Sequence, residues 1–139
     1  MKNMANSNVV LQLSPKTAIN SRSYAKAAEL IVSKAKESGR DSWFERLSMS
    51  KLRGIYGLIT NVYTRVNKPE DFERNMTDLQ YIKVKMAYEA GRERTVKDFL
   101  IFTGLMSALD SIKTYDQFIL YCRYAESLVA YFKFFGGKE

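Results

Sequence analysis

The residues best suited to chemistry in this sequence are basic and aromatic side chains that recur at helical spacing. A helix that begins at Pro69 would place one such set in a narrow arc at 100° per residue: Arg74, Tyr81, Lys85, Tyr88 and Arg92. Long cations reach phosphates, and tyrosine rings or hydroxyls contact bases or sugars, so this arc is typical of a polyanion-binding surface. Asp78 lies on the same arc, and an ordinary solvated helix face is the alternative interpretation.

Side chains suited to catalysis are sparse. The chain has no histidine and a single cysteine, Cys122. Without histidine the commonest general base and metal ligand are missing, and one thiol forms neither a disulfide framework nor a cysteine-based zinc site. Acidic residues are scattered or lie at expected helix starts, and no glycine-rich phosphate loop is present. We therefore expect no enzyme activity, no catalytic residues, no metal site and no cofactor.

Composition and charge narrow the class of protein. A length of 139 residues suits one domain with one hydrophobic core. The net charge of +7 is spread along the chain, which favours a polyanionic partner, although a generally positive surface is the simpler alternative. No run of 18 apolar residues is present, and the apolar patch 9–13 is too short for a signal-peptide core. These features predict a cytoplasmic protein with no membrane partner.

The elements that position these side chains are predicted to be helices. Apolar residues recur at helical spacing in five segments, which predict a single small all-α bundle of about five helices: residues 21–38, 48–66, 69–91, 95–110 and 114–135. Gly104 marks a point where the fourth helix is expected to kink or break. Residues 1–20 show no period and contain Pro15, so we expect a flexible leader before a single helical domain over residues 21–139.

Two features of these helices leave alternatives open. Gly54 and Gly57 lie inside the second helix, where glycine is unfavourable, and they indicate close approach either of another helix, which we favour, or of a phosphate backbone. The fifth helix is apolar nearly all round, so it is either the centre of the bundle or partly covered by another subunit. In the second case the expected interface residues are Tyr124, Tyr131 and Phe134.

Two segments, residues 79–100 and 121–139, carry a resemblance to a known family. Their distinctive motifs are Ala90-Gly91-Arg92, Val96-Lys97-Asp98, Cys122-Arg123-Tyr124, Leu128-Val129-Ala130-Tyr131 and Gly136-Gly137-Lys138-Glu139. On these motifs, residues 48–139 resemble the Csm-type small subunit of type III-A CRISPR effector complexes. Residues 1–47 show no such resemblance.

The resemblance implies a non-catalytic, all-helical subunit that takes part in antiviral defence. Several copies would stack beside the other subunits of a ribonucleoprotein filament, along the groove where CRISPR RNA pairs with target RNA. They would hold the RNA backbone without reading its sequence, because base pairing supplies the recognition. Motif positions support Arg53, Lys83, Arg92 and Arg123 as RNA contacts, whereas Lys85 depends on the helical arc. For Arg123, a subunit interface formed by the last helix is an equal alternative. The full predicted RNA-binding set is Lys51, Arg53, Lys83, Lys85, Arg92, Arg94 and Arg123.

Two other functions fit the composition. One is a free-standing helical homodimer that binds nucleic acid or an acidic partner. The other is a peripheral membrane protein that docks through basic helices.

Overall fold

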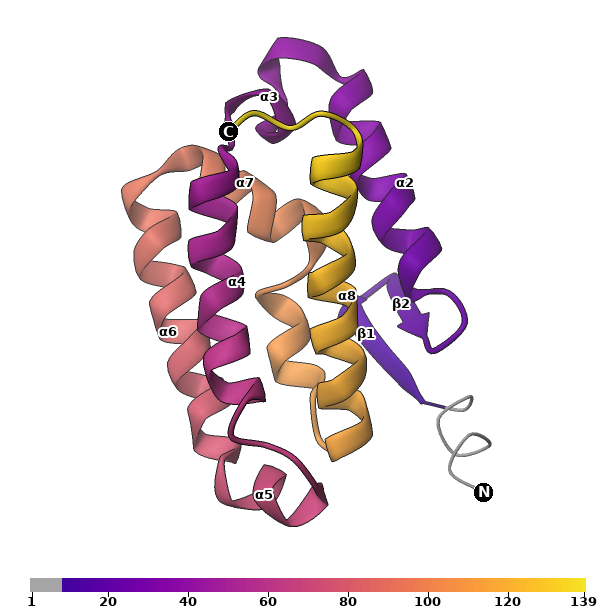
Figure 1. Ribbon diagram of the computed structural model, residues 1–139, viewed down its shortest axis with the longest axis vertical. Coiled ribbons are helices and arrows are strands. Elements are labelled where there is room, and N and C mark those ends of the chain that lie inside the picture. The colour runs from indigo at the N-terminus through magenta and orange to yellow at the C-terminus, as the bar shows by residue number, and fades with distance from the viewer. Residues whose placement is uncertain (1–8) are drawn as a thin grey trace.

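Helix α8 (Tyr115–Phe134) is the central element of the computed structural model, which describes residues 9–139 (Figure 1). Two helices pack along it, α2 (Tyr24–Glu37) and α4 (Met49–Tyr63), and Figure 1 shows α8 between them. The other helices are α3 (Trp43–Arg46), α5 (Pro69–Arg74), α6 (Met76–Arg92) and α7 (Arg94–Thr103), with 3-10 turns at Gly39–Asp41 and Ser107–Ser111. The fold is thus mainly helical, as the sequence predicts.

The apolar surface of α8 is covered largely by its own chain. Phe118, Tyr121, Tyr124 and Phe132 are all 0% exposed. The helix begins at a capping box, in which the Thr114 hydroxyl accepts a hydrogen bond from the backbone N–H of Gln117 and the Gln117 side chain accepts one in return from the backbone N–H of Thr114. For most of its length α8 is therefore the centre of the bundle, which was one of the two alternatives for this helix.

Three of the five predicted helices correspond to helices of the structure, and the other two differ from it in their bounds. The first, second and fifth predicted helices correspond to α2, α4 and α8. The third is wrong as one helix, because it breaks at Asn75 into α5 and α6. The Asn75 amide donates a 2.8 Å hydrogen bond to the Asp71 carbonyl oxygen, and such a side-chain bond competes with the helical ladder. The fourth, predicted over residues 95–110, is confined to Arg94–Thr103.

The predicted flexible leader is wrong for residues 10–20. Strands β1 (Val10–Ser14) and β2 (Thr17–Asn20) pair antiparallel, with Leu11 opposite Ile19. Leu11, Leu13 and Ile19 are at most 2% exposed, so the hairpin contributes to the core. The alternation Leu11-Gln12-Leu13 is a strand signal that a search for helical period passes over. Residues 1–8 of the predicted leader lie outside the described residues.

Gly104 is required where the hairpin meets the end of α7. Its φ is +78°, a left-handed conformation that suits glycine. A Cβ at this position would lie 2.7 Å from the Leu13 carbonyl oxygen and 2.8 Å from the Leu13 Cβ. The predicted interruption of the fourth helix at Gly104 is therefore confirmed: α7 ends at Thr103 and a 3-10 turn follows. No helix within residues 9–139 is both long and apolar enough to span a bilayer.

Candidate nucleic-acid interface

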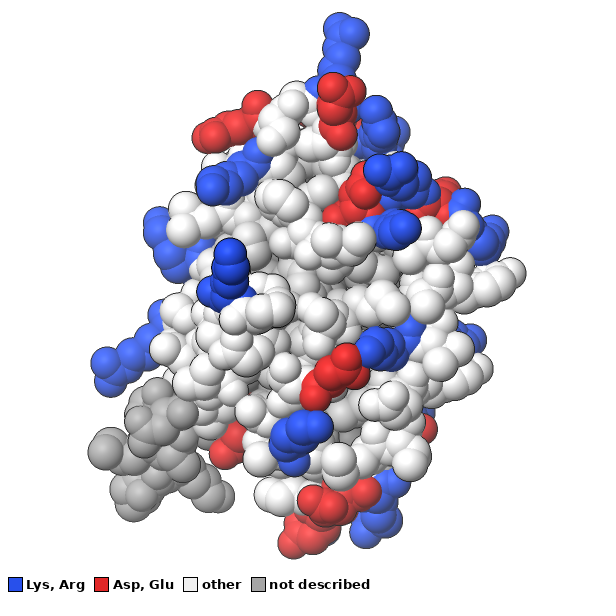
Figure 2. Space-filling view, turned by 180° about the vertical axis from the view of Figure 1, so that it is seen from behind, with Lys and Arg blue, Asp and Glu red and all other residues white. Residues whose placement is uncertain are grey.

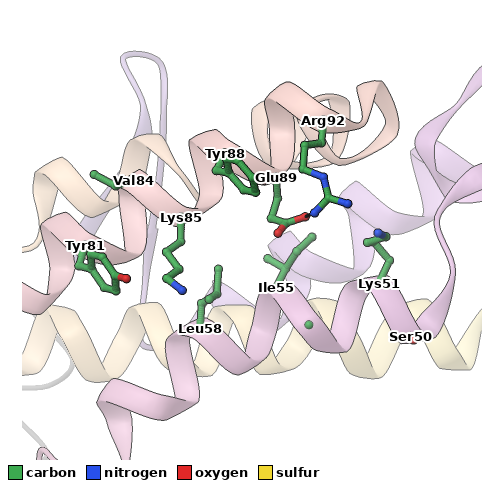
Figure 3. A pocket seen from close by; sticks show the side chains of 11 residues that line it. Ser50, Lys51, Ile55, Leu58, Tyr81, Val84, Lys85, Tyr88, Glu89 and Arg92 are labelled. Carbon is green, nitrogen blue, oxygen red and sulfur yellow. Dashed lines mark ion pairs between the residues drawn. The ribbon is translucent and has the colours of Figure 1, made fainter.

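A groove runs between α4 and α6, and we refer to it as the α4–α6 groove (Figure 3). Its cavity volume is about 610 Å³, and it is lined by Ser50, Lys51, Gly54, Ile55, Leu58, Tyr81, Val84, Lys85, Tyr88, Glu89 and Arg92. A smaller cavity of about 230 Å³ continues along the same helices and shares Leu58, Tyr81 and Lys85 with it. The groove therefore combines three cations and two tyrosines with an apolar floor.

A cation from the next turn of α6 lies over each tyrosine ring of the α4–α6 groove. The Lys85 ammonium lies 5.2 Å from the centroid of the Tyr81 ring, and the Arg92 guanidinium lies 5.6 Å from that of Tyr88. Figure 3 shows Lys85 and Arg92 extending from α6 toward α4. The tyrosines themselves are 60% and 65% exposed. The predicted arc thus exists for these four residues. The two tyrosine rings and the two cations are all accessible to a ligand.

Not all members of the predicted arc reach the groove. Arg74 belongs to α5, and the break at Asn75 separates it from α6; its guanidinium pairs with Asp71 instead. Asp78, which dilutes the positive charge in the predicted arc, is bound by Arg65 at 2.8 Å. The only acidic side chain that lines the main cavity is Glu89, and it pairs with Arg92 at 3.5 Å. The positive character of the groove is therefore retained.

The two helical glycines open the α4 wall of this groove. Gly54 lines the main cavity and Gly57 lines its continuation, and no atom lies within 4 Å of a Cβ built at either position. Helix packing within residues 9–139, the reason favoured from the sequence, is therefore wrong. The bare helix surface leaves room for an occupant to approach the α4 backbone closely.

The predicted RNA-binding residues do not all share one surface. Lys51, Lys85 and Arg92 line the α4–α6 groove. Lys83 lies outside the groove lining and pairs with Asp110 at 2.5 Å, although it is only two residues from Lys85. Arg94 pairs with Asp98 at 3.2 Å and also lies outside the groove lining.

Two predicted contacts make no ion pair within residues 9–139, Arg53 and Arg123. Arg53 is exposed on α4, next to Gly54. Arg123 lies on the other side of α4, in adjoining cavities that it lines together with Tyr24 and Tyr63. Glu126 lines one of these cavities, and burial followed by the charge of Glu126 raises the pKa of the nearby Tyr56. Arg123 is thus separated from the groove.

The groove also contains residues that charge and aromaticity did not single out. Ile55 and Leu58 form its α4 side, and Val84 is 63% exposed between the two tyrosines of α6. An apolar residue three positions after Tyr81 and four before Tyr88 lies on the same helix face, and this spacing was the available signal.

Of the three predicted interface residues, Tyr124 is wrong because it is buried, whereas Tyr131 and Phe134 are accessible. Tyr124 is 0% exposed and its hydroxyl donates to the Thr103 carbonyl oxygen at 2.6 Å, so it cannot face another subunit. Phe134 is 75% exposed, and Tyr131 is partly exposed. The Phe134 ring packs edge-on against Tyr131 and Phe135, with centroids 6.2 and 5.2 Å away. We refer to Tyr131, Phe134 and Phe135 as the C-terminal aromatic cluster.

The only cysteine is not set up as a nucleophile. Cys122 is buried in α8 between core residues. Burial, with a smaller contribution from Glu126, raises the pKa of its thiol far above the ordinary value, so the reactive thiolate is disfavoured. Within residues 9–139, no group of three or more Cys, Asp or Glu side chains is placed to hold a metal ion.

Charge on the face opposite to that of Figure 1 is dispersed. Figure 2 shows basic side chains scattered over this face, with acidic side chains among them and uncharged surface between them. The net charge of +7 therefore does not create one continuous basic patch there.

Comparison with known proteins gives one consistent result. Residues 25–138 match the family model described as Csm2 Type III-A. A protein of Streptococcus thermophilus named CRISPR system Cms protein Csm2 is 34% identical over 87% of this chain and 98% of its own length. Proteins of the same name from Enterococcus italicus and Mycobacterium tuberculosis are 42% and 31% identical, over 66% and 84% of this chain and 70% and 94% of their own lengths.

Proposed function

Because the chain belongs to the Csm2 family of type III-A CRISPR systems, whose members are small structural subunits, we propose that it holds guide and target RNA along the α4–α6 groove. The observation that carries this proposal is the convergence of Lys51, Lys85 and Arg92 on one groove with two exposed tyrosines. Cations supply most of the affinity for a nucleic-acid backbone, and they carry no sequence information.

The pairing of the groove cations is compatible with RNA binding. Lys85 makes no ion pair in the described part of the chain, whereas Lys51 pairs with Glu93 at 3.4 Å and Arg92 with Glu89 at 3.5 Å. Exposed pairs of this kind contribute about 0–1 kcal/mol, so a phosphate can replace the carboxylate at little cost. Arg53, beside the open Gly54, extends the cationic surface over α4.

The subunit acts in this proposal as a non-catalytic, cytoplasmic part of the type III-A effector complex and takes part in antiviral defence. Several copies associate with one another and with the other subunits, and the exposed C-terminal aromatic cluster is the surface for self-association. Its most exposed ring, Phe134, supports this role because a large apolar side chain is favoured in a protein interface over solvent. Chemistry on RNA or DNA belongs to other subunits.

A salt titration with matched variants tests the RNA site. Lys85→Ala and Arg92→Ala should each weaken binding of two unrelated RNAs equally. Because each variant removes one phosphate-binding cation, the slope of log affinity against log salt should fall by about 0.7 for a single strand or about 0.9 for a duplex. Lys83→Ala and Arg94→Ala are the controls, because they remove the same charges from α6 and the adjacent α7 outside the groove. Equal effects of all four variants would contradict the groove as the binding site.

A further inference from the structure

Two equivalent units follow one another along α6. Each consists of a tyrosine and a cation four residues later: Tyr81 with Lys85, and Tyr88 with Arg92. The units are seven residues apart, which is two helical turns and a rise of about 10.5 Å. Both rings line the same groove, with the exposed Val84 between them.

The two tyrosine rings are exposed, which favours contact with a molecule bound in the groove. Tyr81 and Tyr88 are 60% and 65% exposed, and neither hydroxyl makes a hydrogen bond within residues 9–139. Aromatic rings of this size are favoured against another flat or apolar group rather than in water. The opposite wall at Gly54 carries no side chain, so space is available over the rings.

The charges around the rings select the class of occupant. Three cations line the cavity against one carboxylate, that of Glu89. A purely apolar helix of another protein would leave Lys85 without a partner and would cover the exposed ion pairs of Lys51 and Arg92 without adding a contact to their charges. A single nucleic-acid strand satisfies both features, because its bases stack on tyrosine rings and its phosphates lie within reach of Lys85 and Arg92. A duplex does not, since its bases are already stacked on one another.

We infer that Tyr81 and Tyr88 are stacking platforms for two unpaired bases of one RNA strand, so that the α4–α6 groove prefers single-stranded to fully paired RNA. This inference rests on the proposed function and names the form of RNA that the groove takes. The two rings are about 10.5 Å apart along α6, so they contact different bases. Every base has a stacking face, and the site therefore stays sequence-tolerant.

The experiment separates ring stacking from phosphate contacts. The full chain is titrated with a short unstructured RNA, with an abasic ribose-phosphate strand of equal length and with the corresponding duplex. Tyr81→Leu/Tyr88→Leu removes the aromatic faces and keeps apolar bulk, whereas Tyr81→Phe/Tyr88→Phe keeps the faces and removes only the hydroxyls. Tyr63→Leu, an exposed ring on the other side of α4, is the matched control.

The leucine pair should weaken binding of the single strand by about 5- to 150-fold for each ring that stacks, without changing the salt slope. Affinity for the abasic strand and for the duplex should stay unchanged, and the phenylalanine pair and Tyr63→Leu should bind as the wild type. Circular dichroism checks that every variant is folded.

Three outcomes would overturn the inference. If the leucine pair binds the single strand normally while Lys85→Ala weakens it, the groove contacts only the backbone and the proposed function stands. If the leucine pair weakens the single and abasic strands equally, the rings only position the cations. If it impairs association with protein subunits but not with RNA, the face is a protein interface. A failure of the proposed function is distinct, because then Lys85→Ala and Arg92→Ala also have no effect on RNA binding.

Discussion

The hydroxyl of Tyr124 donates a hydrogen bond of 2.6 Å to the carbonyl oxygen of Thr103. Thr103 is the last residue of α7, where backbone carbonyls lose their intrahelical partners. Tyr121 donates a similar bond of 2.7 Å to the carbonyl oxygen of Leu105, on the other side of Gly104. Two hydroxyls of α8 therefore satisfy the buried backbone where the chain leaves α7.

Removal of the Tyr124 hydroxyl should destabilise the fold. In Tyr124→Phe the Thr103 carbonyl oxygen is left buried without this donor, which should lower the free energy of unfolding by about 1–3 kcal/mol. Urea unfolding measures the change, and Tyr88→Phe, at an exposed ring, is the control and should change stability by less than about 0.5 kcal/mol. Equal stability of the two variants would contradict the role assigned to this hydrogen bond.

Alanine should have opposite effects at two glycines. Gly104→Ala forces a Cβ against Leu13 backbone at a φ of +78° and should cost more than about 1 kcal/mol of stability. Gly57→Ala adds a Cβ in open space within α4 and should stabilise the helix by up to about 1 kcal/mol. Thermal unfolding of both variants checks this. A stabilised Gly104→Ala would show that the hairpin does not pack closely on this residue.

Stability should decline at alkaline pH. Burial raises the pKa of the Cys122 thiol above its ordinary value of 9.0 and that of the Tyr121 phenol above 10.0. These groups hold protons more tightly in the folded state, so their stabilising contribution is complete below the ordinary values and is lost as pH rises above them. Urea unfolding between about pH 8 and pH 11 should show a shallower decline for Cys122→Ala. An unchanged slope in this variant would contradict the contribution of the thiol.

The C-terminal aromatic cluster should govern self-association. Phe134→Glu places a charge on a side chain that is 75% exposed, so the isolated chain should stay folded while its self-association weakens. Sedimentation over a range of protein concentrations measures this, with circular dichroism as the test of folding. Ala130→Glu introduces the same charge at another exposed position of α8 and should associate normally. If Phe134→Glu associates as the wild type does, the interface lies elsewhere.

The helices with strong local signals could be predicted from the sequence. Ser48 caps α4 by accepting a hydrogen bond from the Lys51 N–H, and Thr114 caps α8. Both caps act within one turn, so the residues that decide them are neighbours in the sequence. The family motifs, such as Ala90-Gly91-Arg92, are equally local and needed no tertiary information.

Features that depend on distant residues could not be predicted in this way. The hairpin at residues 10–20 is held by pairing between its strands and by burial of Leu13 against Gly104, far away in the sequence. The core position of Tyr124 is decided by its bond to the end of α7, whereas the similar ring of Tyr131 is partly exposed. Periodicity identifies an apolar helix face, but it does not say which neighbour covers that face.

The contrast between Lys83 and Lys85 shows most clearly which features the sequence determined and which the tertiary structure decided. The sequence by itself determined that α6 carries cations and tyrosines at helical spacing, and that the chain lacks the histidine and cysteine clusters of common catalytic sites. Only the tertiary structure decided that Lys83 meets Asp110 while Lys85 enters the α4–α6 groove. The physical reason is that residues two positions apart on a helix point about 200° apart, so different packing partners receive two chemically identical side chains.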